Sequence, residues 1–195
     1  MSKKRYPPRV PRFAAGIRAQ ESRNGTGRSW WAREWMQRLE SMGLRGRLGR
    51  GRSYASSGQV VSLEISGPHV TACVQGTRPE PYAVSLDFRA PTSAMRKRLL
   101  AAMRAEPMYV ARLLADDLPL EVADLFSEIG LCLFPGEKLG PGQYDMTSRC
   151  TCPDYANPCK HTTAVLLLLG EEVARRPLTL LELRGILPED LYDED

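Results

Sequence analysis

Three cysteines and a histidine stand within twelve residues near the end of this 195-residue chain, and no other feature constrains its folding as much. Their spacing is Cys-x-Cys-x6-Cys-x-His, and they are Cys150, Cys152, Cys159 and His161. Thiolates and imidazole are the ligands that tetrahedral zinc prefers in proteins. We therefore predict that these four side chains hold one zinc ion.

The number of ligands favours a structural zinc ion over a catalytic one. A hydrolytic zinc keeps one coordination position for water, whereas these four residues fill all four positions. A Cys–His nucleophile pair would not need Cys150 and Cys152, a redox pair favours Cys-x-x-Cys, and an iron–sulfur centre usually has four thiolates. A disulfide framework is disfavoured because the five cysteines are odd in number and unevenly spread.

The spacing also predicts the backbone on each side of the ion. Residues 143–151 can extend as a strand, from one side of which Cys150 and Cys152 would project. A helix is expected to begin with Pro158 in its first turn and to run to about Arg176. The zinc ion would thus clamp the edge of a hairpin to a helix.

The entry into this helix is expected to be irregular. Residues two apart do not face each other on a helix, so Cys159 is predicted to lie in the entry turn and to bend back toward the ion beside His161. Asp154 or Asn157 is available to cap the helix. Lys160, between two ligands, is expected to offset the negative charge of zinc bound by three thiolates.

Hydrophobic periodicity predicts an α+β fold around this site. A helix of about 13 residues follows Ser29. Apolar and polar residues then alternate over 54–88, which predicts a three-stranded antiparallel meander, and residues 91–130 form a helical middle section. His69 and Cys73 are assigned to ordinary turn and sheet positions in the meander.

Tryptophans mark the first helix. Trp31 and Trp35 recur with Leu39 at helical spacing. Aromatic side chains beside arginines could stack on bases, but a stripe with this period more often packs onto a domain core. We therefore predict a core role for it.

Composition shifts divide the chain into five parts. We expect a flexible basic arm (1–25), a helix plus antiparallel sheet (26–90), a helical section (91–130), a zinc module (131–187) and an acidic tail (188–195).

Charge is distributed unevenly along the chain. Residues 1–53 carry 14 Lys or Arg against three acids, a net +11, whereas the remainder carries 13 against 20, a net −7. A basic segment attracts phosphates through counterion release, and an acidic segment does not. Nucleic-acid contact is therefore predicted for the first quarter of the chain, although such a segment can also be merely solubilising.

A stretch of arginines and glycines after Gly43 is the candidate loop for phosphate contact. Glycine permits close backbone approach and unusual dihedral angles. An exposed linker whose arginines face water is the alternative. The residues predicted to contact nucleic acid are Arg45, Arg47, Arg50, Arg52 and Lys160.

No segment suggests a membrane or a secretory pathway. The longest uninterrupted apolar stretch, 164–169, is six residues, far below the roughly 20 that a spanning helix needs. The N-terminus lacks the apolar core of a signal peptide. We expect a cytoplasmic protein with neither a membrane partner nor a small-molecule substrate.

At the metal cluster the chain resembles the SWIM-type zinc finger family, on the segment CTCPDYANPCKHTTAVLLLL. The segments GRSWWAREWMQRLES and RPLTLLELRG are also similar to blocks of small bacterial SWIM proteins. The resemblance implies zinc at Cys150, Cys152, Cys159 and His161 in a C-terminal ββα module. It further implies binding of DNA or protein, and for the bacterial type an association with a Swi/Snf-type helicase.

Three functions are compatible with these features. The first is a non-enzymatic, zinc-binding accessory protein that contacts DNA and assists such a helicase. An alternative is a protein adaptor whose zinc finger is purely structural and whose acidic part docks a basic partner. The third, a nuclease with a second metal at Asp145 and Asp154, is disfavoured, and we expect no enzymatic activity.

Overall fold

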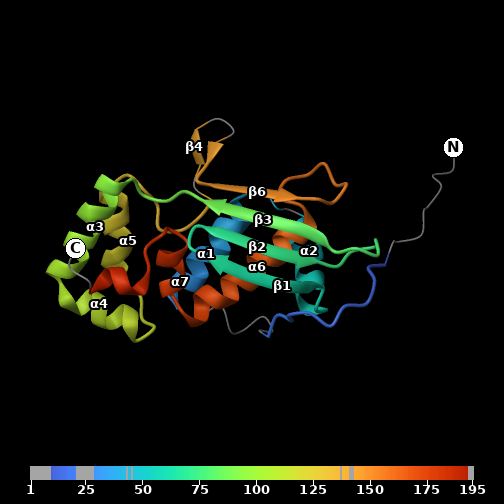
Figure 1. Ribbon diagram of the computed structural model, residues 1–195, viewed down its shortest axis with the longest axis horizontal. Coiled ribbons are helices and arrows are strands. Elements are labelled where there is room, and N and C mark those ends of the chain that lie inside the picture. Colours follow the sequence, from blue (N-terminus) through green and yellow to red (C-terminus); the bar gives the residue numbers. More distant parts are fainter. Residues whose placement is uncertain are drawn as a thin grey trace.

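The computed structural model describes residues 10–20, 29–42, 44, 46–136, 138–140 and 143–192. At its centre is a four-stranded antiparallel sheet in the order β1-β2-β3-β6 (Figure 1). The strands are β1 (Val60–Ser66), β2 (His69–Val74), β3 (Tyr82–Phe88) and β6 (Met146–Cys150). The alternating segment thus supplies three neighbouring strands, as predicted, and a fourth strand from the metal module pairs with β3.

Helices cover one face of this sheet and extend the molecule at one end (Figure 1). In the described part of the chain they are α1 (Trp30–Ser41), α2 (Arg47–Ser56), α3 (Ser93–Ala105), α4 (Pro107–Leu114), α5 (Leu120–Glu128), α6 (Lys160–Arg175) and α7 (Leu178–Glu182). A 3-10 helix, η1 (Pro188–Leu191), follows, and a short hairpin, β4 (Lys138–Gly140) and β5 (Gln143–Tyr144), precedes β6. Within the residues described, no helix is long and apolar enough to cross a membrane.

Helix α6 forms the centre of the hydrophobic core. Ten of its sixteen residues are buried, because it lies between the sheet and the other helices. The indole N–H groups of Trp31 and Trp35 donate to the carbonyls of Val173 and Leu166 on α6, at 3.1 and 3.2 Å. Both tryptophans are buried, so the core role predicted for the stripe is confirmed.

The arginine and glycine stretch is a helix and not the open loop or linker expected from its sequence. Gly46 starts α2 with a φ of 75°, which favours glycine. Gly51 lies against α6, where a Cβ atom would stand 2.5 Å from Cγ2 of Thr163. Glycine here permits two helices to approach closely, and the packing gained outweighs its poor helix propensity.

A buried ion pair joins Asp145, just before β6, to Arg184, just after α7. Arg184 donates to Oδ2 of Asp145 at 2.5 Å, and the two side chains are 1% and 0% exposed. The same guanidinium donates to the carbonyls of Arg89, Leu133 and Phe134. Asp145, considered above as a ligand of a second metal, is therefore a structural residue.

Candidate metal centre

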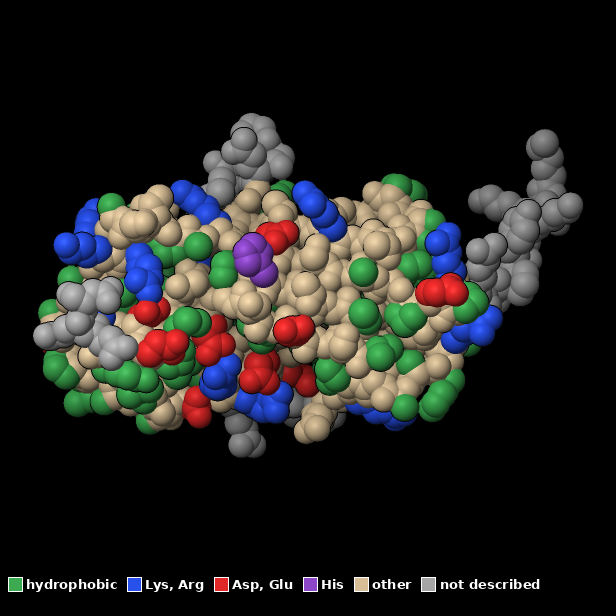
Figure 2. Space-filling model, viewed as in Figure 1, with side chains coloured by type: hydrophobic (Ala, Val, Ile, Leu, Met, Phe, Trp, Pro, Cys, Tyr) green, Lys and Arg blue, Asp and Glu red, His purple; other side chains and the backbone are tan. Residues whose placement is uncertain are grey.

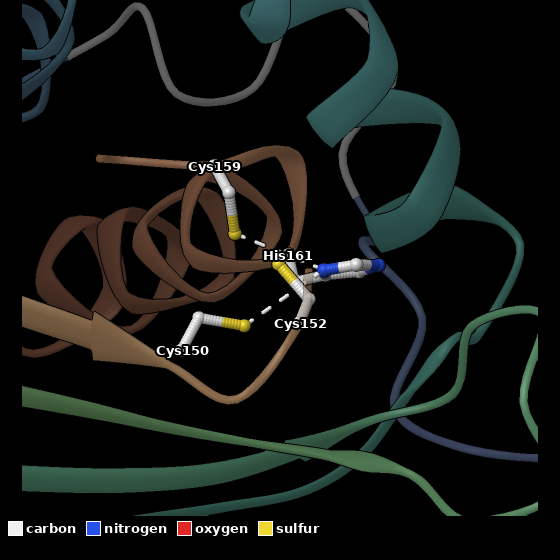
Figure 3. A group of neighbouring side chains, drawn as sticks. All are labelled: Cys150, Cys152, Cys159 and His161. Carbon is white, nitrogen blue, oxygen red and sulfur yellow. Dashed lines mark hydrogen bonds between the residues drawn. The ribbon is translucent and has the colours of Figure 1, made fainter. Parts of the chain in front are cut away.

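Four side chains from two elements meet at the end of the sheet (Figure 3). Cys150 is the last residue of β6, and Cys152 follows in the turn. Cys159 is the N-cap of α6, and His161 lies in the first turn of this helix. Their ligand atoms lie within 4.8 Å of one another, so the structure brings together all four residues that the spacing predicted.

Distances within the group match a tetrahedral zinc site. The Nδ1 atom of His161 lies 3.8 Å from Sγ of Cys150 and 3.7 Å from Sγ of Cys159. With Zn–S bonds of about 2.3 Å and Zn–N bonds of about 2.0 Å, tetrahedral geometry places sulfur and nitrogen about 3.5 Å apart. The cluster is therefore within a few tenths of an ångström of its zinc-bound shape, with Nδ1 as the imidazole ligand.

Sheet register directs the first thiolate inward. Cys150 stands opposite the buried Val84 of β3, so its side chain points to the covered face of the sheet, toward α6. The hydrogen bond from Thr151 N to Ala83 O continues the pairing by one residue beyond the strand. Strand pairing therefore positions one side of the site independently of the metal.

Cys159 lies in the extended entry to α6, as predicted, but neither of the side chains predicted to cap this helix does so. Cys159 is extended, with φ −85° and ψ 177°, so its sulfur turns back from the helix. Asp154 instead accepts from the N–H of Ala156 within the loop. Asn157 donates to the carbonyl of Ser148 and accepts from its hydroxyl, which ties the loop to β6. The capping role predicted for these two side chains is therefore wrong.

The thiol groups are not equivalent in acidity. The pKa of Cys159 is lowered, mainly because the Cys150 thiol donates a hydrogen bond to it, with help from His161 and Thr162 against the opposing effect of burial. The same hydrogen bond, together with burial, raises the pKa of Cys150, and burial raises the pKa of Cys152. Cys159 is therefore the first of the three thiols to ionise, and a bound zinc ion would displace protons from the other two.

Two tyrosines hold the imidazole, and the sequence pattern did not reveal them. The ring of His161 lies 5.1 Å from that of Tyr54 on α2 and 4.7 Å from that of Tyr82 on β3. Its Nε2 atom is buried without a hydrogen-bond partner among the described residues. Aromatic packing therefore orients this ring, in place of the hydrogen bond that a ligating histidine usually donates.

The residues predicted to contact phosphates are only partly described. Arg45 lies outside the described residues. Arg50 and Arg52 are exposed on α2, and Arg47 is half-buried. Lys160 lies at the start of α6 and faces α2, where its Nζ atom is 5.0 Å from the centre of a tyrosine ring, that of Tyr54. Three of the five predicted cations thus lie on α2 and one at the start of α6.

The described residues form no second metal cluster that would support a nuclease. Within the described ranges, the four residues named above are the only group of three or more Cys, His, Asp or Glu side chains placed to hold an ion. Asp145 is engaged by Arg184, while Asp154 is exposed in the loop.

Comparison with known proteins agrees with this geometry. Residues 143–170 match the family model described as SWIM zinc finger. The chain is 38% identical over 186 residues to the uncharacterized protein Rv2102 of Mycobacterium tuberculosis, covering 95% of this chain and 65% of the relative. It therefore spans just under two thirds of that protein, and no solved structure matches. The matched family and the four converging side chains fit a structural zinc ion.

Proposed function

We propose that this chain, which carries a SWIM zinc finger over residues 143–170, is a non-enzymatic factor that contacts DNA through α2 and the start of α6. The observation that carries the proposal is the direct link between the metal centre and α2. Tyr54 of α2 packs on the zinc ligand His161, and Lys160 faces the same tyrosine.

This link fixes α2 relative to the metal centre. It runs from zinc to His161, from the imidazole ring to Tyr54, and from Tyr54 to the rest of α2. Helix α2 also packs closely on α6 at Gly51. The helix therefore has two points of attachment to the element that supplies the zinc ligand.

Positive charge on α2 and at the start of α6 supports contact with phosphates. Arg50 and Arg52 are exposed on α2, and Lys160 faces the same helix from the start of α6. Arginine and lysine side chains that neutralise phosphates release counterions and supply most of the affinity that does not depend on base sequence. A rigid pair of helices would therefore present cations to a DNA backbone.

An exposed aromatic side chain adds a means of contacting bases. Tyr155 is 99% exposed, in the loop between the zinc ligands Cys152 and Cys159. Hydrogen bonds between Asn157 and Ser148 hold this loop against β6. Aromatic side chains presented in this way stack on unpaired bases.

The proposed absence of enzymatic activity rests on the coordination of the ion. Four protein ligands leave no position for a reacting water, so the zinc ion supplies folding energy and no Lewis-acid chemistry. The accessory role beside a Swi/Snf-type helicase rests on the family resemblance. Co-purification of such a helicase from the native cell, retained after nuclease treatment, would support this role, and its absence would remove it.

A salt titration of DNA affinity tests the proposal. Fluorescence anisotropy of a labelled duplex is measured from about 50 to 200 mM salt, where each phosphate contact contributes a slope of about −0.9 in log affinity against log salt. The double variant Arg50→Gln, Arg52→Gln is expected to bind more weakly. The steepness of its slope should fall by about 1.8, which corresponds to the loss of two phosphate contacts. Lys97→Gln together with Arg98→Gln, which also removes two positive charges from exposed positions, both on α3, is the control and should reduce neither the affinity nor the slope as much.

Two results would refute DNA contact at this surface. One is undetectable affinity of the zinc-loaded wild type at moderate salt, which would favour the adaptor function. The other is equal binding by the wild type and the α2 double variant.

A further inference from the structure

The end of the molecule farthest from the zinc site exposes large apolar side chains. Met108 and Leu114 on α4 are 59% and 51% exposed, Leu120 at the start of α5 is 59% exposed, and Tyr192 after η1 is 60% exposed. Figure 2 shows hydrophobic side chains gathered over α4. We name these four residues the α4 patch. Single exposed apolar residues are ordinary on protein surfaces, but a group of them on neighbouring elements marks an interaction site.

A shallow groove adjoins the α4 patch and shares Leu114 and Tyr192 with it. The groove has a volume of about 400 Å³ and runs between α4 and η1. Its apolar lining includes Pro107, Val110, Ala111, Leu114, Leu191 and Tyr192. A groove between two short helical elements suits the apolar face of a third helix, which is a recurring mode of peptide recognition.

Acidic residues outnumber basic ones at this end of the molecule. Between residues 105 and 130 the chain has six acids and one basic residue, Arg112, which pairs with Asp117. Arg104 also lines the groove, but it donates to the carbonyl of Asp190. With α3 included, residues 93–130 and η1 together carry eight acids against five basic residues, a net −3. Three exposed acids, Glu106, Asp116 and Glu189, lie within two residues of the groove-lining Pro107, Leu114 and Leu191, and we call them the acidic rim. The exposed acids at this end are Glu106, Asp116, Glu121, Asp124, Glu128 and Glu189.

We propose that the α4 patch binds an amphipathic helix of a partner protein, with an apolar stripe flanked by lysines and arginines. The apolar stripe fills the groove, and the basic flanks face the acidic rim. Charge complementarity of this kind raises association rates and excludes wrong partners. A nucleic acid or an anionic membrane is repelled by the same acids, and a second copy docking through this patch would bring like charges together.

A model peptide tests the proposal. The probe is a peptide of about 18 residues, long enough to form a helix, with leucine at helical spacing and lysine elsewhere. Binding to the zinc-loaded full chain is measured by isothermal titration calorimetry. A peptide with glutamate in place of lysine, and a scrambled peptide of unchanged composition, are the controls. Both are expected to bind at least about tenfold more weakly than the probe.

Variants locate the binding site. Leu114→Gln and Ala111→Gln change exposed residues of α4 that line the groove, so thermal melting should be unchanged while probe affinity falls about tenfold. Val61→Gln, at a similarly exposed apolar residue of β1, is the matched control and should bind the probe as the wild type does. Neither α4 variant is expected to change DNA affinity, which separates this test from that of the proposed function.

Three results would overturn the proposal. Equal binding by the wild type and both α4 variants would place the peptide elsewhere. Equal binding of the lysine and glutamate peptides would show that the acidic rim does not select the partner. Self-association of the wild type that disappears in Leu114→Gln, seen by analytical ultracentrifugation, would assign the patch to a second copy of this chain.

Discussion

Removing the charge of Asp145 tests how the segment that enters β6 is held to the chain after α7. In Asp145→Asn the side chain keeps its shape, but the guanidinium of Arg184 loses its carboxylate partner in a site where both side chains are at most 1% exposed. The other carboxylate oxygen of Asp145 accepts from the N–H of Gly136. An asparagine amide has only one oxygen, so it can accept only one of these two hydrogen bonds.

The magnitude follows from the burial of the pair. Breaking a buried ion pair by removing one partner costs about 3–5 kcal/mol, because the remaining charge is left uncompensated. This is a large fraction of the roughly 5–15 kcal/mol that stabilises a typical domain. For a chain of this size, about 2–4 °C of melting temperature is lost per kcal/mol, so a fall of roughly 6–20 °C is expected. Three carbonyl acceptors retain part of the network around Arg184.

Equilibrium unfolding in urea and thermal melting measure the effect, with zinc content determined in parallel. Cys150 lies five residues beyond Asp145 along β6, about 16 Å away at the rise of a strand, so zinc content should be unchanged. The ion pair of Arg112 with the partly exposed Asp117 provides the control: because solvent screens this pair, Asp117→Asn should lower stability far less than Asp145→Asn. If Asp145→Asn is no more destabilising than Asp117→Asn, the reasoning about the buried pair is wrong.

Three further predictions concern the metal and its neighbours. Purified protein should contain about one zinc ion per chain by elemental analysis. Cys152→Ser should lower this metal content and also the amount of folded protein recovered after purification. Zinc binding at neutral pH should release about two protons, because the pKa values of Cys150 and Cys152 are raised and that of Cys159 is lowered. Zinc affinity should therefore fall as the pH falls. Calorimetry in buffers of different ionisation enthalpy measures the number of protons released. Gly51→Val should separate α2 from α6 and cost about 1–3 kcal/mol, as measured by urea unfolding, whereas Gly49→Val meets no atom within 4 Å and should show only its helix-propensity effect.

The zinc ligands could be predicted from sequence because their information is local. Four soft ligands within twelve residues leave few chemical alternatives, and the extended entry of Cys159 follows from the period of the helix after it. The strands over 60–88 were predictable for a similar reason, since alternation over a short segment reports which face is buried.

Features that depend on distant segments could not be predicted. The tyrosines that hold His161 come from α2 and β3, and nothing in the spacing of the ligands indicates them. Arg184 and Asp145 are 39 residues apart, and each taken alone resembles an ordinary surface charge. Glycines in α2 suggested a loop because sequence shows their poor helix propensity but not the helix packed against Gly51.

Helix α6 connects the metal to the stability of the whole fold. Its first turn supplies a zinc ligand, and its later turns bury Leu166 and Val173 against the tryptophans of α1. Hydrophobic packing along those later turns does not require the ion, whereas the loop before Cys159 is held mainly by the ligands and by the contact of Asn157 with Ser148. Loss of zinc should therefore release the loop and the start of α6 first, and with them the Tyr54 contact that positions α2. DNA affinity should consequently depend on zinc even under conditions where the core remains folded.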